Sequence, residues 1–266
     1  MASHLKNVPV YFAICQVRFN QLLMLTELIP AIQEGFRKAG YPSYETQSNL
    51  VIQMVAQSPQ VGKPEQLHPM PSTHDSYQFG NLERTHLFML DSQALTLQST
   101  QYGCFEAFST EFLKGLNIVH EKVDLSFTER IGLRYLERVM PCKGDSLEQY
   151  LVPEVHGLLN RLGGQGLYTY TEAMSQQDEV KLRARALIQG GALAFPPDVQ
   201  PNNMAIDARF LNYQGVSALL DNDGFVENRE AFSLETIGAH LNKIDELVDR
   251  AFKATVTDHA LDAWGQ

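Results

Sequence analysis

The chain has 266 residues, of which 44% are hydrophobic and 20% are charged, a composition that is ordinary for a globular protein and argues against disorder except at the ends and in a few loops. The formal net charge of −10 argues against a general binder of polyanions, so nucleic acid is a less expected partner than a protein. No stretch approaches the roughly 18 consecutive apolar residues of a membrane-spanning helix, so we expect a soluble chain without a membrane span.

The cysteines and the N-terminus indicate the compartment. The three cysteines are Cys15, Cys104 and Cys142, and their odd number and wide spacing disfavour both a disulfide framework and a zinc site. The N-terminus lacks the basic region, long apolar run and small-residue cleavage site of a signal peptide. We therefore expect a protein of the reducing cytoplasm that holds no metal and no cofactor.

The first half of the chain predicts strands interspersed with two helices. Runs rich in β-branched and aromatic residues predict strands over residues 8–19, 44–55, 85–90, 94–101 and 130–140. Apolar residues at helical spacing predict two amphipathic helices, one marked by Leu25, Ile29, Ile32 and Phe36 and the other by Phe105, Phe108, Phe112 and Leu116. Residues 57–76 contain four prolines (Pro59, Pro64, Pro69 and Pro71) and predict a long exposed loop.

The second half begins with a connector over residues 141–166. Three further strands are predicted over 166–175, 179–189 and 204–213, with a Gly-, Pro- and Asn-rich loop between the last two. A long amphipathic helix starts near Ser233, and a short one ends near Trp264. The fold class is therefore α+β, a mostly antiparallel sheet with helices packed on one side. We expect two sequential α+β halves, residues 1–145 and 146–266, each made of strands followed by a helix.

Two stripes of cations mark the strongest candidate site. Alternate residues of a strand share one face, so Arg130, Arg134 and Arg138 project together from one predicted strand. The same spacing places Lys181, Arg183 and Arg185 on one face of another strand. If the strands are neighbours, they present a surface suited to phosphate or carboxylate. Arg209, in the predicted strand 204–213, would continue this row.

The alternative interpretation of the stripes is an ordinary charge ladder. Antiparallel sheets commonly expose one face to solvent, and nearby carboxylates such as Glu129, Glu137 and Asp207 can form cross-strand ion pairs. Reversing Arg134 and Arg183 to Glu distinguishes the two interpretations. A binding surface predicts lost binding with little change in melting temperature, and a ladder predicts a large drop in melting temperature.

Other local patterns carry less chemistry. Residues 221–224 read Asp-Asn-Asp-Gly and partly match a calcium-binding EF-hand loop, but Leu219 stands where the first ligand should be. We interpret this segment as a polar turn before the last long helix. No histidine pair has metal-ligand spacing, and no phosphate-binding loop or Gly-x-Ser-x-Gly motif is present. No catalytic residue can be assigned.

Three segments carry a resemblance to a known family. They are the opening Pro-Val-Tyr-Phe-Ala-Ile-Cys-Gln-Val-Arg-Phe-Asn from Pro9, the central Arg-Ile-Gly-Leu-Arg-Tyr-Leu from Arg130, and the final aromatic residue Trp264. They resemble a sporadically distributed family of bacterial proteins of about this length and of uncharacterised role. The patchy distribution implies a part in antiphage defence or toxin-linked systems. In that family an Asn commonly follows the central run, where this chain has Glu137.

The leading functional prediction is a non-catalytic binding protein that uses the arginine-bearing sheet face. Its ligand would be a protein partner or a small anion. From Asp221 to the end, ten acidic residues outnumber four basic ones, which suggests a second surface for self-association or a partner. The alternatives are an enzyme acting on a phosphorylated small molecule or nucleic acid, and a chaperone- or antitoxin-like protein with an apolar groove.

Overall fold

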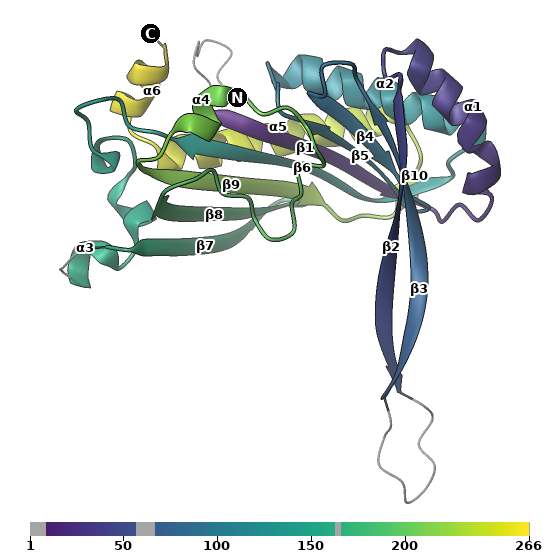
Figure 1. Cartoon of the computed structure of the whole chain (residues 1–266), viewed down its shortest axis with the longest axis horizontal. Helices are drawn as coiled ribbons and strands as arrows, with labels where there is room; N and C mark the ends of the chain where they lie inside the picture. The colour runs from purple at the N-terminus through teal and green to yellow at the C-terminus, as the bar shows by residue number, and fades with distance from the viewer. Residues whose placement is uncertain (1–8, 57–66, 163–165, 266) are drawn as a thin grey trace, which may run out of the picture.

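The chain folds around one ten-stranded antiparallel sheet whose main helices lie on one face, as the α+β prediction requires (Figure 1). The computed structural model describes residues 9–56, 67–162 and 166–265. In the sheet the strands run in the order β2-β3-β4-β5-β1-β6-β9-β8-β7, with the short β10 paired to β6. Within the described residues, none of the helices combines the length and apolarity needed to cross a membrane.

The elements have the following bounds. The strands are β1 (Val10–Phe19), β2 (Ser43–Ala56), β3 (Leu67–Gly80), β4 (His86–Leu90), β5 (Ala94–Ser99), β6 (Phe127–Val139), β7 (Tyr168–Gln177), β8 (Val180–Gly190), β9 (Val216–Val226) and β10 (Glu230–Ala231). The α-helices are α1 (Leu25–Lys38), α2 (Phe105–Val123), α3 (Leu159–Leu162), α4 (Ala208–Asn212), α5 (Leu234–Thr255) and α6 (Asp258–Gly265), and two 3₁₀ turns are η1 (Leu147–Gln149) and η2 (Pro153–His156).

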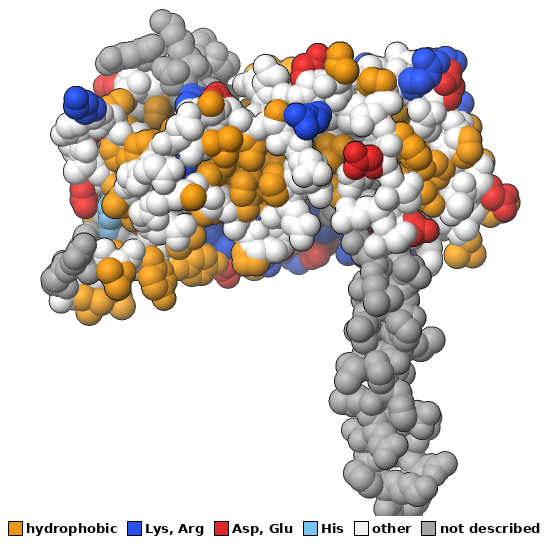
Figure 2. Space-filling model, in the orientation of Figure 1, with side chains coloured by type: hydrophobic (Ala, Val, Ile, Leu, Met, Phe, Trp, Pro, Cys, Tyr) orange, Lys and Arg blue, Asp and Glu red, His pale blue; other side chains and the backbone are white. Residues whose placement is uncertain are grey.

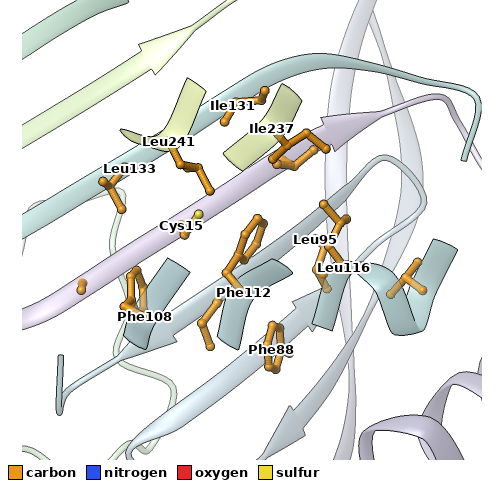
Figure 3. Close-up of a cluster of buried hydrophobic side chains, with 14 of the residues drawn as sticks. Cys15, Phe88, Leu95, Phe108, Phe112, Leu116, Ile131, Leu133, Ile237 and Leu241 are labelled. Atoms are coloured by element: carbon orange, nitrogen blue, oxygen red, sulfur yellow. The ribbon is translucent and has the colours of Figure 1, made fainter. Parts of the chain in front are cut away.

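The main core lies between the sheet and the helix layer formed by α1, α2 and α5. Each of these helices has a buried apolar stripe, for example Phe108, Phe112 and Leu116 on α2, which packs against inward-facing strand residues such as Cys15 and Leu133 (Figure 3). Burial of this face removes its apolar area from water, the dominant stabilising contribution to such a fold. The opposite face of the sheet is therefore the one available for polar chemistry.

Gly115 sets the distance between α2 and the sheet. A Cβ atom added there would lie 2.3 Å from Phe88 of β4. We therefore expect Gly115→Ala to lower the free energy of unfolding by about 1–3 kcal/mol, since the strain of overpacking outweighs the gain in helix propensity. Gly238 of α5 is the matched control, because the nearest atom to an added Cβ is Leu113 Cδ1 at 3.5 Å. Gly238→Ala should stabilise the chain by up to about 1 kcal/mol. Urea unfolding of both variants tests the opposite signs.

The two sides of the sheet are related by a structural repeat centred on β1 and β6. At the middle of this antiparallel pair, Gln16 faces Gly132. On the outer sides, Gln16 faces Thr96 of β5 and Gly132 faces Phe225 of β9. Helix α2 begins nine residues after Thr96, and α5 begins nine residues after Phe225. A twofold rotation through the Gln16–Gly132 pair thus relates β1, β5 and α2 to β6, β9 and α5.

This repeat divides the chain between α2 and β6. Strands β1–β5 form one side of the sheet and β6–β9 form the other. One continuous sheet joins the two sides. The division into halves at residues 1–145 and 146–266 stays a prediction.

The hairpin of β2 and β3 projects from the body of the molecule (Figure 1). Its presence corrects the predicted loop over 57–76, because residues 67–76 belong to β3. Residues 57–66 lie outside the described residues. The loop was predicted from the prolines, two of which, Pro69 and Pro71, lie in β3. In this stretch β3 pairs with β2 only, since its pairing with β4 is confined to residues 77–80. A strand with one neighbour tolerates proline, whose missing N–H can face away from that neighbour.

The second face of the sheet is partly covered by the segment that joins β8 to β9. This segment, residues 191–215, packs Val199, Met204 and Phe210 against Tyr11 and Phe12 of β1. The predicted strand over 204–213 is wrong, because those residues form part of this segment and the short helix α4. Asp207 caps α4 by accepting a hydrogen bond from the backbone N–H of Arg209 at 2.8 Å, the usual role of Asp before a helix.

Candidate anion-binding site

The register of β6, β9 and β8 brings the predicted cations together on the face opposite the main helices. Arg134 of β6 faces Asp223 of β9, which in turn faces Arg183 of β8. One row along, Arg185 faces Asp221. The two cationic stripes therefore flank β9, which carries carboxylates. The arginines converge on this strand, and its carboxylates neutralise some of them.

Arg134 is the most tightly held member. Its Nε and Nη2 donate to the two oxygens of Asp221 at 2.7 and 2.9 Å, and its Nη1 donates to Asp198 at 2.7 Å. Arg185 Nη2 lies 2.7 Å from the same Asp221 carboxylate. Burial opposes ionisation of Arg134, but the hydrogen bonds to both aspartates outweigh it and hold the pKa of Arg134 above its ordinary value. Arg134 is thus a buried structural cation with one exposed partner, Asp198, whose side chain is 56% exposed.

Arg130 is held much more loosely. Its nearest carboxylate oxygen, on Asp223, is 3.6 Å away, and its Nη1 donates to Gln16 at 3.4 Å. The guanidinium folds over Gly132, where an added Cβ would lie 2.7 Å from Nη1, and over the ring of Phe225 at 4.6 Å. Its side chain is only 21% exposed. Burial lowers the pKa of Arg130 and raises the pKa of Asp223, as expected for charges removed from water without close compensation.

Two further arginines, Arg18 and Arg183, have no ion pair within the described part of the chain. Among the residues that the structure describes, Arg183 makes no hydrogen bond or ion pair, although it faces Asp223 across the strands. The twofold that relates the two halves places Arg18 at the position equivalent to Arg134. Arg18 faces Ala94 where Arg134 faces Asp223. The first half therefore supplies a cation without its carboxylate, next to Arg130 in the β1–β6 pair.

A pocket of about 360 Å³ opens beside these groups. Its lining comes from six strands, the turn between β4 and β5, and the segment between β8 and β9: Ile14, Gln16, Ser76, Met89, Asp91, Thr96, Gln98, Arg130, Gly132, Arg134, Asp198, Val199 and Asp223. The Asp91 carboxylate already accepts hydrogen bonds from the backbone N–H groups of Gln93 and Ala94, at 2.7 and 2.9 Å. The pocket is within the size range of small-molecule sites and is unusually polar for one.

Of the seven predicted site residues, Arg130 and Arg134 line this pocket. Arg183 and Arg185 lie on β8, across β9 from them, and the other three lie elsewhere. Arg138 is 2% exposed and donates to the backbone carbonyls of Gly191 and Tyr213 and to Ser217, so it anchors the covering segment. Arg209 lies on α4 and not on a strand, and it pairs with Asp207 at 3.2 Å. Lys181 is on β8 as expected, but it forms an exposed ion pair with Glu227 at 2.9 Å.

Sequence reasoning missed the carboxylates of the site. Residues 221–224 are not a turn but part of β9, paired on both sides. Asp and Asn are poor strand formers, and their ion pairs and hydrogen bonds with β6 and β8 override that preference. The apolar run before Asp221 and the even spacing of Asp221 and Asp223, which matches the even spacing of the arginines, are signals that could have identified the strand. No comparable signal marks Asp198.

Glu137 points to the opposite face of β6 and is fully buried. Asn222 Nδ2 donates to its Oε2 at 3.4 Å. The pKa of Glu137 is raised well above the usual value for Glu, mainly by burial and further by the charge of Asp221.

Because the pKa of Glu137 is higher in the folded state, its protonated form stabilises the fold. This contribution to the free energy of unfolding is fully present below the unfolded-state pKa of about 4.3 and is lost as the pH rises through the folded-state pKa. Glu137→Gln keeps the neutral form at every pH. We expect it to raise the free energy of unfolding at pH 8 by about 1–3 kcal/mol and to leave it nearly unchanged at pH 4.5. Urea unfolding across this range measures the difference, with the exposed Glu83→Gln as control. An equal change at both pH values would contradict the assignment.

In the part of the chain that the structure describes, no group of three or more His, Cys, Asp or Glu side chains is arranged to hold a metal ion. A comparison with models of protein families gave no match to this chain. A search of curated proteins likewise gave none. The family resemblance and the defence role that it implies therefore stay predictions.

Proposed function

We propose that this chain is a binding protein that holds a small anionic ligand, through carboxylate or phosphate oxygens, in the pocket between β1, β5, β6 and the segment joining β8 to β9. The observation that carries the proposal is the state of Arg130. Its guanidinium is largely buried and lines the pocket, and its shortest contacts with polar acceptors among the described residues are 3.4 Å to Gln16 and 3.6 Å to Asp223. A desolvated guanidinium gains most from close, charge-assisted acceptors.

The charge balance supports an anion over a cation. Two arginines line the pocket, Arg130 and Arg134, and three more lie on neighbouring strand positions: Arg18 opposite Arg130, and Arg183 and Arg185 on β8. Four carboxylates lie among them, Asp91, Asp198, Asp221 and Asp223. Two of the four are unavailable to Arg130 and Arg183: Asp91 is used by its own turn, and Asp221 is shared by Arg134 and Arg185. Over these nine side chains the arginines outnumber the carboxylates by one, and the carboxylate oxygen nearest to Arg130 is 3.6 Å away.

Asp198 occupies the position that a ligand anion would contest. It reaches Arg134 from a surface segment and remains more than half exposed. A ligand carboxylate or phosphate entering the pocket would meet this charge at its wall, so Asp198 weakens binding of an anion there. Asp198→Asn should therefore raise affinity for inorganic phosphate roughly tenfold, about 1.4 kcal/mol.

The test is thermal unfolding with inorganic phosphate or succinate at constant ionic strength. A ligand at 100 times its dissociation constant stabilises by about 2.7 kcal/mol, a shift of several degrees for a chain of this size. We expect the shift in the unaltered chain, a larger one in Asp198→Asn and none in Arg130→Gln. Equal shifts in all three proteins, or none with either probe, would overturn the proposal.

A second candidate function, an enzyme acting on a phosphorylated small molecule, rests on Asp223. This carboxyl lines the same pocket, is close to Arg130, and has a pKa raised by burial, a combination found in general acids. Release of phosphate from a phosphate monoester that is lost in Asp223→Asn would favour the enzyme. Binding without turnover favours the binding protein.

A further inference from the structure

The last strand of the sheet presents an unpaired edge. β7 lies at the end of the strand order and pairs only with β8, over all ten of its residues. In an antiparallel pair, alternate residues direct their backbone N–H and C=O groups away from the neighbour. No backbone hydrogen bond joins these groups to any other described part of the chain. The edge is therefore a template for a further strand.

This edge lacks the features that usually block such pairing. Its sequence, Tyr-Thr-Tyr-Thr-Glu-Ala-Met-Ser-Gln-Gln, contains one charge, Glu172, and neither lysine nor proline. The register with β8 is continuous, without a bulge. Natural sheets protect exposed edges with lysine, proline, bulges or a covering element. Lysine, proline and bulges are absent over these ten residues, although Gly157, just after η2, packs against Thr169 and Thr171. The missing sequence protection indicates that the edge has a partner.

Apolar side chains flank the same edge. Tyr168, Tyr170 and Met174 are 67%, 52% and 56% exposed, and they alternate onto one face of β7. Three leucines beside them are still more exposed: Leu158, Leu162 and Leu167. In Figure 2 these hydrophobic side chains lie along the border formed by β7 and α3. Half of the large apolar side chains that are exposed among the described residues gather here, as at protein interfaces.

We propose that β7 pairs with β7 of a second copy of this chain, antiparallel and about a twofold axis, to form a continuous sheet across a dimer. A twofold axis through Thr171 would place Tyr168 opposite Met174 and Tyr170 opposite Glu172 of the second copy. Tyr170 Oη already donates to Glu172 at 2.6 Å within one chain, so the same two groups are complementary across the axis. The only carboxylate of the strand then faces a hydroxyl and not its own copy.

This complementarity favours a second copy over a foreign strand. The chain carries a net charge of −10, so most of its surfaces repel one another, and β7 offers ten residues with a single charge. An isologous pair of antiparallel strands also satisfies the closed twofold symmetry of most homodimers. The proposal does not depend on the anion pocket.

The experiment compares two substitutions at Tyr170 in the full chain by sedimentation and by light scattering coupled to gel filtration. Tyr170→Glu puts a carboxylate opposite Glu172 of the second copy, and Tyr170→Lys puts an ammonium group there. We expect the unaltered chain to be a dimer, Tyr170→Glu to weaken dimerisation at least about tenfold, and Tyr170→Lys to preserve it. Because Tyr170 is exposed, both variants should keep the melting temperature of the monomer fold.

The outcomes are distinct. A monomeric unaltered chain overturns the proposal and leaves the edge to a strand from another protein. Equal weakening of dimerisation by Tyr170→Glu and Tyr170→Lys also overturns it, because residue 170 would then not lie opposite Glu172 of the second copy. Loss in Tyr170→Glu that is restored by adding Glu172→Lys supports it.

Discussion

Replacing Arg134 by Glu should lower the free energy of unfolding by at least about 3–5 kcal/mol, the usual result of breaking a buried ion pair. Arg134 is 8% exposed and donates two hydrogen bonds to Asp221, whose side chain is 3% exposed. The substitution would bury a new carboxylate beside Asp221, and of the two arginines that contact Asp221 among the described residues it would leave Arg185. Urea unfolding at pH 7 measures the loss.

The sequence alone predicts that reversing Arg134 leaves the melting temperature nearly unchanged if the stripe is a binding surface. The structure revises that expectation for Arg134 and keeps it for Arg183. Arg183→Gln removes a half-buried cation that has no partner among the described residues, so we expect a change within about 0.5 kcal/mol. Similar stabilities for Arg134→Glu and Arg183→Gln would contradict the distinction between a structural and an available arginine.

Replacing Arg138 by Ala should release the segment that covers the second face of the sheet. Arg138 bonds to the carbonyls of Phe210, Gly191 and Tyr213 and to Ser217. Each buried carbonyl left without a donor costs about 1–3 kcal/mol. We expect a loss of roughly 3–5 kcal/mol in the free energy of unfolding.

Limited proteolysis provides a second readout for Arg138→Ala, because undocking of residues 191–215 should expose them to cleavage before global unfolding. Arg209→Ala is the matched control, since this arginine lies in the same segment and forms an exposed ion pair with Asp207. Such pairs contribute less than about 1 kcal/mol. If both variants were cleaved at the same rate, the anchoring role of Arg138 would be wrong.

The parts of the fold that follow a simple period were predictable. The stripes of α1, α2 and α5 repeat at helical spacing, and their predicted apolar residues, such as Phe36, Phe112 and Leu241, are buried in the structure. The strands predicted over 85–90 and 94–101 are present too, as the antiparallel pair β4 and β5. In these elements local preference and burial agree, so the sequence pattern is sufficient.

The errors occur where tertiary contacts override local preference. Asp221, Asn222 and Asp223 lie within a strand because Arg134, Arg185 and buried Glu137 supply their partners from other segments. Residues 204–213 resemble a strand in composition. They instead belong to the segment that covers the second face of the sheet, and Arg138 holds this segment by donating to the carbonyl of Tyr213. Such pairings join residues far apart in the chain, so the sequence marks them at most indirectly, as the even spacing of Asp221 and Asp223 does.

The candidate site was predictable only in part. The even spacing of Arg130, Arg134 and of Arg183, Arg185 indicates a shared face, and the structure places them on one. The sequence could not show that β9 would lie between the two stripes, and so could not separate neutralised arginines from available ones.

The most direct test of the anion site compares Arg130→Gln with Lys181→Gln by calorimetric titration with inorganic phosphate. Both cations lie over the ring of Phe225, at 4.6 and 5.9 Å, but Arg130 lines the pocket and Lys181 is paired outward with Glu227. The proposed site predicts that Arg130→Gln loses phosphate binding at least about tenfold, whereas Lys181→Gln retains it. Equal affinities in the two variants would show that the bound anion does not depend on the pocket and would contradict the proposal.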